Sequence, residues 1–177
     1  MKKIAGLFLI VLLFTSYTIS KDTDKILWSK DYQLQWKDFK GPAKDPNGMS
    51  AMTSCIVEPQ KDKEGKVSIS CYFDKRTSWR IKKQETDNLL RHEQYHFNLT
   101  EVYTRKIRKE FIEKKVDYAS KDFDKIFKKI WKDCEKAQKT YDKETNHSKV
   151  LEEQSRWEKD IDDQMQELDG FSNPVIN

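Results

Sequence analysis

The stretch Arg91-His92-Glu93-Gln94-Tyr95-His96-Phe97 contains the pattern His-Glu-x-x-His, and the rest of the chain is organised around it. On a helix, residues four apart lie about 40° apart around the axis and one turn apart along it. His92 and His96 can therefore direct two imidazole nitrogens to one metal ion, with Glu93 beside them as a candidate general base. Two imidazoles, a base and an open position describe a catalytic zinc site that lacks its third protein ligand.

Two residues compete for the place of that third ligand. Glu101 is close in sequence, but on a continuous helix it falls about 180° from His92 and points away from the metal. The remaining histidine of the three in the chain is His147, which follows a polar turn. Packing of the predicted helices can bring it over the motif, and we favour His147.

A simpler interpretation is that the histidines are incidental surface residues, and the neighbouring residues argue against it. With His92 at 0° and about 100° per residue, an apolar face forms between about 20° and 100°. It comprises Leu89, His96, Tyr103, Ile107 and Phe111. Polar groups on a buried face need partners, and a metal ion would supply one.

The predicted chemistry is hydrolysis of a peptide or protein substrate. Zinc makes its bound water more acidic, Glu93 accepts the proton, and the resulting hydroxide attacks a polarised carbonyl. Tyr103 and Tyr141 are candidates for stabilising the oxyanion by their position alone, and core packing is the alternative role for each.

The first 20 residues have the three parts of a secretory signal peptide. A start with Lys2 and Lys3 precedes the apolar run Ile4–Phe14, and a polar stretch ends at Ser20. A retained membrane anchor is the alternative. Nothing later is apolar enough to cross a bilayer. We therefore expect a secreted or periplasmic protein whose residues 21–177 form a single domain without membrane contact after signal cleavage.

Charges of both signs are nearly balanced. The chain has 34 Lys and Arg against 30 Asp and Glu, a net charge of +4, and loss of Lys2 and Lys3 leaves +2. The signs alternate along the sequence, which is typical of a solvated surface. No basic segment with interleaved aromatic residues occurs, so no nucleic-acid partner is expected. A surface-binding domain with exposed Trp28 and Trp79 has no support beyond composition.

The three cysteines suit an oxidising compartment only in part. Cys55 and Cys71 lie on two short alternating stretches that a hairpin could bring together, so a disulfide between them is possible. Cys134 lies in an apolar helical stripe and is predicted to be a buried thiol.

Hydrophobic periodicity predicts an α+β fold in which a small antiparallel sheet of three to four strands precedes three helices. The predicted strands are Tyr32–Trp36, Ala51–Glu58 and Lys66–Asp74. Three helices are predicted. The first begins after Thr86 and ends near Lys114, the second begins after Ser120, and the third begins at Thr145 or Asn146. Residues 170–177 are expected to form a loose tail.

Five segments carry a family resemblance: Leu34-x-Trp36-x-Asp38-Phe39-x-Gly41, Ala51-x-Thr53-Ser54, Leu90-x-His92-Glu93-Gln94-x-His96-Phe97, Tyr141-Asp142-x-Glu144-Thr145-x-His147 and Gln154-x-x-Trp157. Together they resemble a bacterial family of unknown function whose members are described as predicted secreted zinc-dependent proteases. The resemblance implies a zincin-like active-site helix and one zinc ion per chain. It also implies His92, His96 and His147 as the ligands.

The sequence is therefore compatible with two functions. The first is a secreted zinc-dependent hydrolase, a metallopeptidase with Glu93 as general base. The alternative is a non-catalytic secreted module that holds a structural zinc or no metal. A structural site has closed coordination and needs no base, so Glu93 distinguishes the two.

Overall fold

The computed structural model describes residues 24–43 and 48–176. The predicted signal peptide lies outside these residues. The predicted α+β class is confirmed, because two small antiparallel sheets precede three helices. None of the helices in the described ranges is long and apolar enough to cross a membrane.

The larger sheet has the strand order β1-β4-β3, with β1 at Lys25–Leu27, β3 at Cys55–Lys61 and β4 at Val67–Asp74. Strands β3 and β4 form the predicted antiparallel hairpin, in which Cys55 faces Phe73 and Lys61 faces Val67. The apolar residues Val67, Ile69, Cys71 and Phe73 of β4 are buried as predicted, but Ser70 on the opposite face is buried too. A second sheet pairs β2 (Ala51–Met52) with β5 (Trp79–Arg80).

Two strand predictions need correction. The predicted strand Tyr32–Trp36 is irregular chain followed by the short 3-10 helix η1 (Trp36–Asp38). Two of its backbone N–H groups bond to side chains and not to a neighbouring strand. The Leu34 N–H donates to Gln94 Oε1 (2.7 Å), and the Gln35 N–H donates to Asp38 Oδ2 (2.9 Å). The predicted strand Ala51–Glu58 is interrupted at residues 53–54, between β2 and β3.

Helix α1 (Asp87–Lys114) carries the motif and begins where predicted. The Thr86 hydroxyl accepts a hydrogen bond from the Leu89 N–H (3.1 Å), which caps the first turn. The helix ends at Lys114, because the next residue, Lys115, has a left-handed backbone (φ 50°). Helix α2 (Lys121–Thr145) begins in the same way, capped by Ser120.

Helix α3 (Leu151–Glu167) begins later than predicted. Residues Asn146, His147 and Ser148 all have positive φ values, of 47°, 51° and 73°, and therefore cannot be part of a right-handed helix. His147 thus lies in a turn between two helices and not in the first turn of one. The short helices η2 (Lys82–Gln84) and η3 (Asp169–Phe171) complete the elements.

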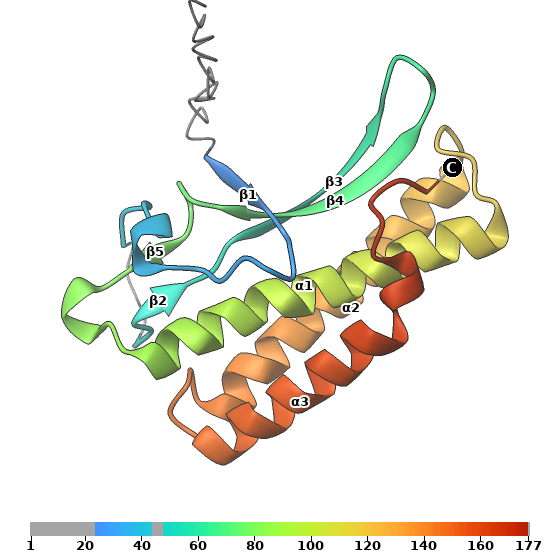
Figure 1. Cartoon of the computed structure of the whole chain (residues 1–177). Coiled ribbons are helices and arrows are strands. Elements are labelled where there is room, and N and C mark those ends of the chain that lie inside the picture. The colour runs from blue at the N-terminus through green and yellow to red at the C-terminus, as the bar shows by residue number, and fades with distance from the viewer. Residues whose placement is uncertain (1–23, 44–47, 177) are drawn as a thin grey trace, which may run out of the picture.

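Helix α1 forms the middle of the molecule, with the larger sheet on one side and α2 and α3 on the other (Figure 1). The three helices run alternately up and down (Figure 1). One core cluster lies between the sheet and α1 and consists of Leu34, Phe39, Cys71, Phe73 and Phe97. Another lies among the helices and consists of Leu99, Val102, Tyr141, Ile161 and Leu168.

Glu101 belongs to a buried ionic network and not to the face that carries the histidines. Its carboxylate binds Arg105 (3.1 Å) and Arg108 (2.8 Å), and all three side chains are almost fully buried. Arg108 also donates to the Ile69 carbonyl oxygen (2.8 Å), which joins α1 to β4. Glu101 therefore points away from the motif, as its helical angle predicted.

The C-terminal segment is attached to the sheet, contrary to the loose tail expected. The Ile69 N–H donates to the Pro174 carbonyl oxygen (2.9 Å), and the Ile176 N–H donates to that of Val67 (3.0 Å). Arg108 further donates to the Phe171 carbonyl oxygen (3.1 Å). The first two of these hydrogen bonds satisfy backbone groups of β4 that β1 is too short to reach.

Candidate metal centre

The two motif histidines lie one turn apart on the face of α1 that packs against α2. The Tyr141 ring stacks on His92, with ring centroids 4.5 Å apart, and meets His96 edge-on at 4.8 Å. Tyr141 is completely buried and does not line the pocket beside the histidines. It holds the two imidazoles in place, which is the packing role and not the oxyanion role considered for it.

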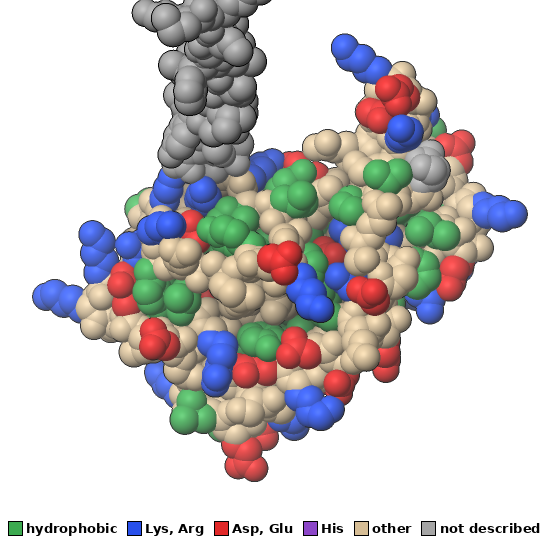
Figure 2. Space-filling view, viewed as in Figure 1, with side chains coloured by type: hydrophobic (Ala, Val, Ile, Leu, Met, Phe, Trp, Pro, Cys, Tyr) green, Lys and Arg blue, Asp and Glu red, His purple; other side chains and the backbone are tan. Residues whose placement is uncertain are grey.

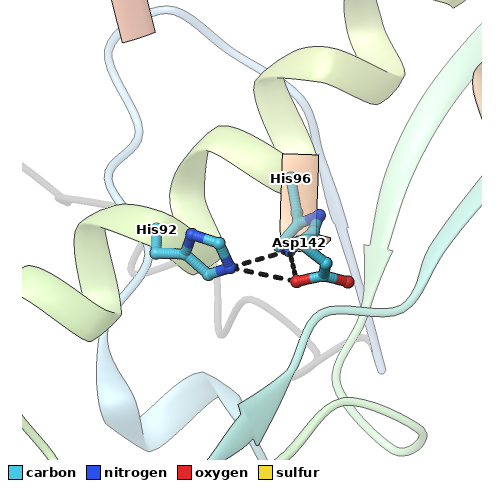
Figure 3. A group of neighbouring side chains, drawn as sticks. All are labelled: His92, His96 and Asp142. Atoms are coloured by element: carbon cyan, nitrogen blue, oxygen red, sulfur yellow. Dashed lines mark hydrogen bonds and ion pairs between the residues drawn. The ribbon is translucent and has the colours of Figure 1, made fainter. Parts of the chain in front are cut away.

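The imidazole nitrogens of His92 and His96 converge on a carboxylate of α2. The two Nε2 atoms are 3.1 Å apart, and Asp142 Oδ1 lies 3.2 Å from the first and 3.1 Å from the second (Figure 3). Among the described residues, these three form the group of potential ligands whose atoms all lie within 4.8 Å of one another. The chain thus presents three donors that could hold a metal ion.

The spacing of this group fits a small cation. Ligand atoms around a tetrahedral zinc ion are roughly 3.3 Å apart, given zinc–nitrogen distances of about 2.0–2.1 Å. The three observed separations of 3.1–3.2 Å are close to that value. A carboxylate oxygen has two lone pairs, yet three imidazoles approach Asp142 Oδ1, since His147 Nδ1 also lies 3.1 Å from it. A cation would satisfy these converging atoms better than hydrogen bonds can.

His147 reaches the centre through Asp142. It lies outside the compact group of three, and its side chain is 35% exposed. Its backbone N–H donates to the Asp142 carbonyl oxygen (3.0 Å), and Asn88 of α1 donates to the Ser148 carbonyl oxygen (2.7 Å). These bonds hold the turn in its left-handed conformation. The structure therefore brings His147 to the site, while its role as third ligand stays a prediction.

Sequence reasoning missed Asp142 as a donor. A signal was available, because Asp142 lies five residues before His147 within a segment already quoted for the family resemblance. Its side chain points from α2 toward α1 because the two helices pack along the motif face (Figure 3). Carboxylates are common third ligands of zinc, so Asp142 competes with His147 for that role.

Gln138 of α2 determines the orientation of His96. Its amide nitrogen donates to the His96 carbonyl oxygen and to Thr100 Oγ1, both at 3.0 Å. Its oxygen therefore faces His96 Nδ1, at 2.5 Å. This contact places the proton on Nδ1 and leaves Nε2 free to bind a metal, as an outer-shell partner of a ligating histidine does.

Glu93 lies in a buried environment that raises its pKa. The side chain is 3% exposed, and its Oε2 atom has no hydrogen-bond partner among the described residues. Burial raises the pKa of Glu93, while the charge of His96 and hydrogen bonds from Thr53 oppose that rise. The Thr53 hydroxyl also donates to the Glu93 carbonyl oxygen (3.1 Å), which fixes the segment over the helix.

The charge state of the centre follows from burial and from the shared carboxylate. Burial lowers the pKa of His92 to about 4 despite its hydrogen bond to Asp142. Burial also acts to lower the pKa of His96, but its contacts with Asp142 and Glu93 outweigh this and raise it to about 9. Burial would raise the pKa of Asp142, yet its hydrogen bonds to His92 and His96 hold it far below its usual range. In the metal-free protein, Asp142 and His96 therefore form an ion pair at neutral pH.

A pocket of about 270 Å³ opens beside the histidines. Residues 49–55 form one wall, and the motif helix and α2 form the others. Met52, Leu89 and Trp131 contribute apolar surface to it. The pocket is therefore bordered by all three histidines, by Glu93 and by Asp142.

A larger groove of about 970 Å³ lies on another side of α1, between residues 28–34 and α3, and contains none of the histidines. Two pairs of its polar side chains bind each other, since Trp28 Nε1 donates to Asn98 Oδ1 (3.1 Å) and the Tyr95 hydroxyl donates to Asp162 Oδ2 (2.9 Å). The face in Figure 2 shows acidic and basic side chains interspersed. The smaller pocket, in contrast, is lined by all three histidines, Glu93 and Asp142.

Two further aromatic predictions can be compared with the structure. Trp79 is 3% exposed and belongs to the core, so it cannot serve as a surface-binding residue. Tyr103 packs in the helical cluster with the Lys106 ammonium 4.4 Å from its ring centre, and it does not line the pocket.

All three cysteines are free thiols in the structure. Cys55 faces Phe73 and Cys71 faces Val57, so the two cysteines are diagonal neighbours on the hairpin. Diagonal side chains lie roughly 7 Å apart, whereas a disulfide needs Cβ atoms about 3.8 Å apart. The possible Cys55–Cys71 disulfide is therefore not formed. Cys55 and Cys134 both line the pocket, and burial raises the pKa of each to about 12, which keeps them protonated.

Comparison with known proteins gives one match. No curated protein and no solved structure matches the chain. One family does match, over a segment that begins in β4 and ends one residue after His147, so it contains the three histidines, Glu93 and Asp142 but not the pocket wall at residues 49–55. Its description assigns no activity, and zinc binding and proteolysis stay predictions. Over residues 70–148, the chain matches the family described as "Bacterial protein of unknown function (DUF922)", which confirms the resemblance to a bacterial family of unknown function.

Proposed function

We propose that this protein is a secreted zinc-dependent hydrolase whose substrates are peptides or proteins. The observation that carries the proposal is the convergence of His92, His96 and Asp142 beside a buried carboxylate oxygen of Glu93 that has no partner in the described chain. A buried, unpartnered carboxylate oxygen is costly, and a base that receives a proton during catalysis explains it. Export rests on the sequence pattern of residues 1–20.

The proposed ligands are His92 Nε2, His96 Nε2 and Asp142 Oδ1. Two imidazoles and one carboxylate would suit a zinc ion, which in catalytic sites takes water or substrate as its fourth ligand. When bound, zinc supplies a Lewis acid that makes water more acidic and polarises a carbonyl oxygen. His147 binds the Asp142 carboxylate from the outer side and orients it, as His147 Nδ1 lies 3.1 Å away. The sequence-based assignment of His147 as third ligand is the alternative within this proposal.

The remaining residues orient the reacting groups. Glu93 accepts the proton from the attacking water and passes it to the leaving amine. Thr53 holds the backbone of Glu93, and Gln138 keeps Nε2 of His96 directed at the centre. The substrate carbonyl enters from the 270 Å³ pocket, where Met52, Leu89 and Trp131 favour an apolar neighbouring side chain.

A structural zinc site is the second candidate, and the position of His147 favours it. If His147 joined the other three donors, the four protein ligands would close the coordination sphere. A closed site would leave no role for Glu93 as a base and none for the pocket. The two functions therefore differ in what happens when Glu93 is changed while the metal is retained.

The test combines metal analysis with cleavage of a peptide library by residues 21–177. We expect one zinc ion per chain and cleavage that chelators abolish and zinc restores. Glu93→Gln should retain the metal and lose about 10²–10⁴-fold in cleavage rate, the usual contribution of a positioned base. Glu135→Gln is the matched control, because Glu135 also lines the pocket but is exposed, and it should cleave normally.

Two results would contradict this proposal. One is equal cleavage by wild type and Glu93→Gln, which would mean that Glu93 is not the base. The other is a zinc-loaded wild type that cleaves no member of the library, which would favour the structural site.

A further inference from the structure

Helix α2 carries a row of lysines along one side, which we name the lysine stripe. Taking about 100° per residue, the eight lysines of the helix all fall within an arc of about 100°, and no acidic residue of α2 falls in that arc. All eight are exposed. The stripe consists of Lys121, Lys125, Lys128, Lys129, Lys132, Lys136, Lys139 and Lys143.

The stripe does not serve the fold. Elsewhere the helices pair their lysines with acids one turn away, as Lys114 with Glu110 and Lys159 with Asp163. In the described part of the chain, no lysine of the stripe has a carboxylate within ion-pair distance. Several stripe lysines are instead four residues apart from one another, such as Lys128 and Lys132. Like charges at that spacing destabilise a helix, so an external anion is the better explanation of the arrangement.

The stripe is long and lies beside the pocket. From its first to its last lysine it covers 22 residue steps, which is about 33 Å along a helix. The residues of α2 that line the pocket, among them Glu135 and Gln138, occupy the neighbouring arc of the helix. Helix α2 lies behind α1 in Figure 1, away from the face on which both signs of charge are interspersed in Figure 2.

We propose that the lysine stripe docks the protein on the surface of an anionic phospholipid bilayer. A straight row about 33 Å long exceeds the span of a small ligand and matches a field of many phosphate headgroups. Lysine carries a point charge and lacks the planar guanidinium with which arginine binds one phosphate in a fixed geometry. The stripe is therefore suited to bind a negatively charged surface and not one particular anion. Nucleic acid is disfavoured because no aromatic residue interrupts the row to stack on bases.

This proposal differs from the expectation of no membrane contact, which considered charge along the sequence. Around the helix axis, the alternating lysines and acids separate onto different sides of α2, and only the fold shows which side is exposed. Docking by the stripe would place the mouth of the pocket close to the lipid surface. It does not depend on zinc or on Glu93, so it can hold even if the hydrolase proposal fails.

The test is sedimentation of residues 21–177 with vesicles. Vesicles of phosphatidylcholine with about one third phosphatidylglycerol should bind the protein, and vesicles of phosphatidylcholine alone should not. Each lysine near an anionic surface changes the partition coefficient roughly fivefold. The combined variant Lys125→Gln, Lys128→Gln, Lys132→Gln and Lys136→Gln should therefore bind about 100-fold more weakly or worse. Binding should also fall steeply when salt is raised from about 0.05 to 0.5 M.

The matched control removes the same number of positive charges from lysines outside α2. Lys61→Gln, Lys63→Gln, Lys82→Gln and Lys83→Gln alter four exposed lysines outside α2 and should keep binding within about threefold. Melting curves check folding, and the stripe variant should melt no lower than wild type because it loses like-charge pairs. Equal losses in both variants, or no binding to anionic vesicles, would overturn the proposal. Binding to DNA or polyphosphate as tight as to vesicles, per phosphate, would also overturn it in favour of a soluble polyanion.

Discussion

The amide oxygen of Gln138 lies 2.5 Å from Nδ1 of His96, and this contact leaves Nε2 directed at Asp142 Oδ1, 3.1 Å away. The nitrogen of the same amide donates to the His96 carbonyl oxygen, so one side chain of α2 binds both the ring and the backbone of His96. Outer-shell partners of this kind affect metal affinity without touching the metal.

The first prediction concerns this contact. Gln138→Met keeps the volume but removes the acceptor, so the zinc dissociation constant should rise about 10–100-fold. Gln138→Glu keeps an acceptor for Nδ1 and should retain more of the affinity than Gln138→Met does. Competition with a chromophoric chelator measures both constants. An unchanged dissociation constant in Gln138→Met would show that the ring is oriented by other contacts.

The second prediction decides the third ligand. If Asp142 binds the metal directly, Asp142→Ala should weaken zinc binding more than His147→Ala, whose loss should stay near the 10–100-fold typical of an outer-shell partner. Zinc retained after dialysis, measured per chain, gives the comparison. The reverse order would assign the third position to His147, as the sequence alone predicted.

The third prediction concerns pH and the stability of the metal-free protein. The folded pKa of Asp142 is lowered, so its contribution is present above its usual value of 3.8 and is lost as the pH falls through the folded value. The folded pKa of His96 is raised to about 9, so its contribution is complete below 6.5 and is lost as the pH rises through 9. The two groups therefore stabilise the fold together mainly between about pH 4 and pH 9.

Thermal melts of metal-free Asp142→Asn and wild type test this window. The variant should melt about 2–8 °C lower at pH 6, and the difference should shrink at pH 10, where His96 is neutral. A difference that is constant across this range would mean that Asp142 stabilises the helix pair without the charge of His96.

The fourth prediction concerns the thiols. Burial raises the pKa values of Cys55 and Cys134 to about 12 and that of Cys71 well above its usual value, so thiolate is scarce at pH 8. Iodoacetamide should therefore leave the native protein unlabelled over a period that labels all three cysteines of the unfolded, unreduced chain. Mass spectrometry counts the labels. A single label on unfolded, unreduced protein after export would show that two cysteines do form a disulfide.

The fifth prediction concerns the turn that holds His147. Ser148 has a φ of 73°, which strains any residue with a side chain, so Ser148→Gly should stabilise the fold by about 1 kcal/mol. Asn88→Ala removes the donor to the Ser148 carbonyl oxygen and should destabilise by about 1–2 kcal/mol. Urea unfolding measures both, and stabilisation by Asn88→Ala would contradict the role assigned to this contact.

Local sequence determined the parts of the site that lie within one element. The helical period alone put His92 and His96 on one face and Glu101 on the opposite one, and Thr86 and Ser120 marked where two helices begin. The alternation of β4 likewise predicted its hairpin with β3. Each of these features depends on residues within a few positions of one another, because helix and strand periods and end caps are local properties of the backbone.

Only the tertiary structure decided the rest. Asp142 and Gln138 contact His96 although they are 46 and 42 residues away in sequence. The Leu34 N–H likewise bonds to Gln94, which is 60 residues away, instead of to a neighbouring strand. No local pattern encodes such contacts, because the angle and register at which α1 packs on α2 depend on the entire core. The same packing leaves the lysines of α2 exposed and places His147 Nδ1 3.1 Å from Asp142 Oδ1. Sequence periodicity thus defined the face of α1 that carries the candidate metal ligands, and helix packing determined which side chains complete the site.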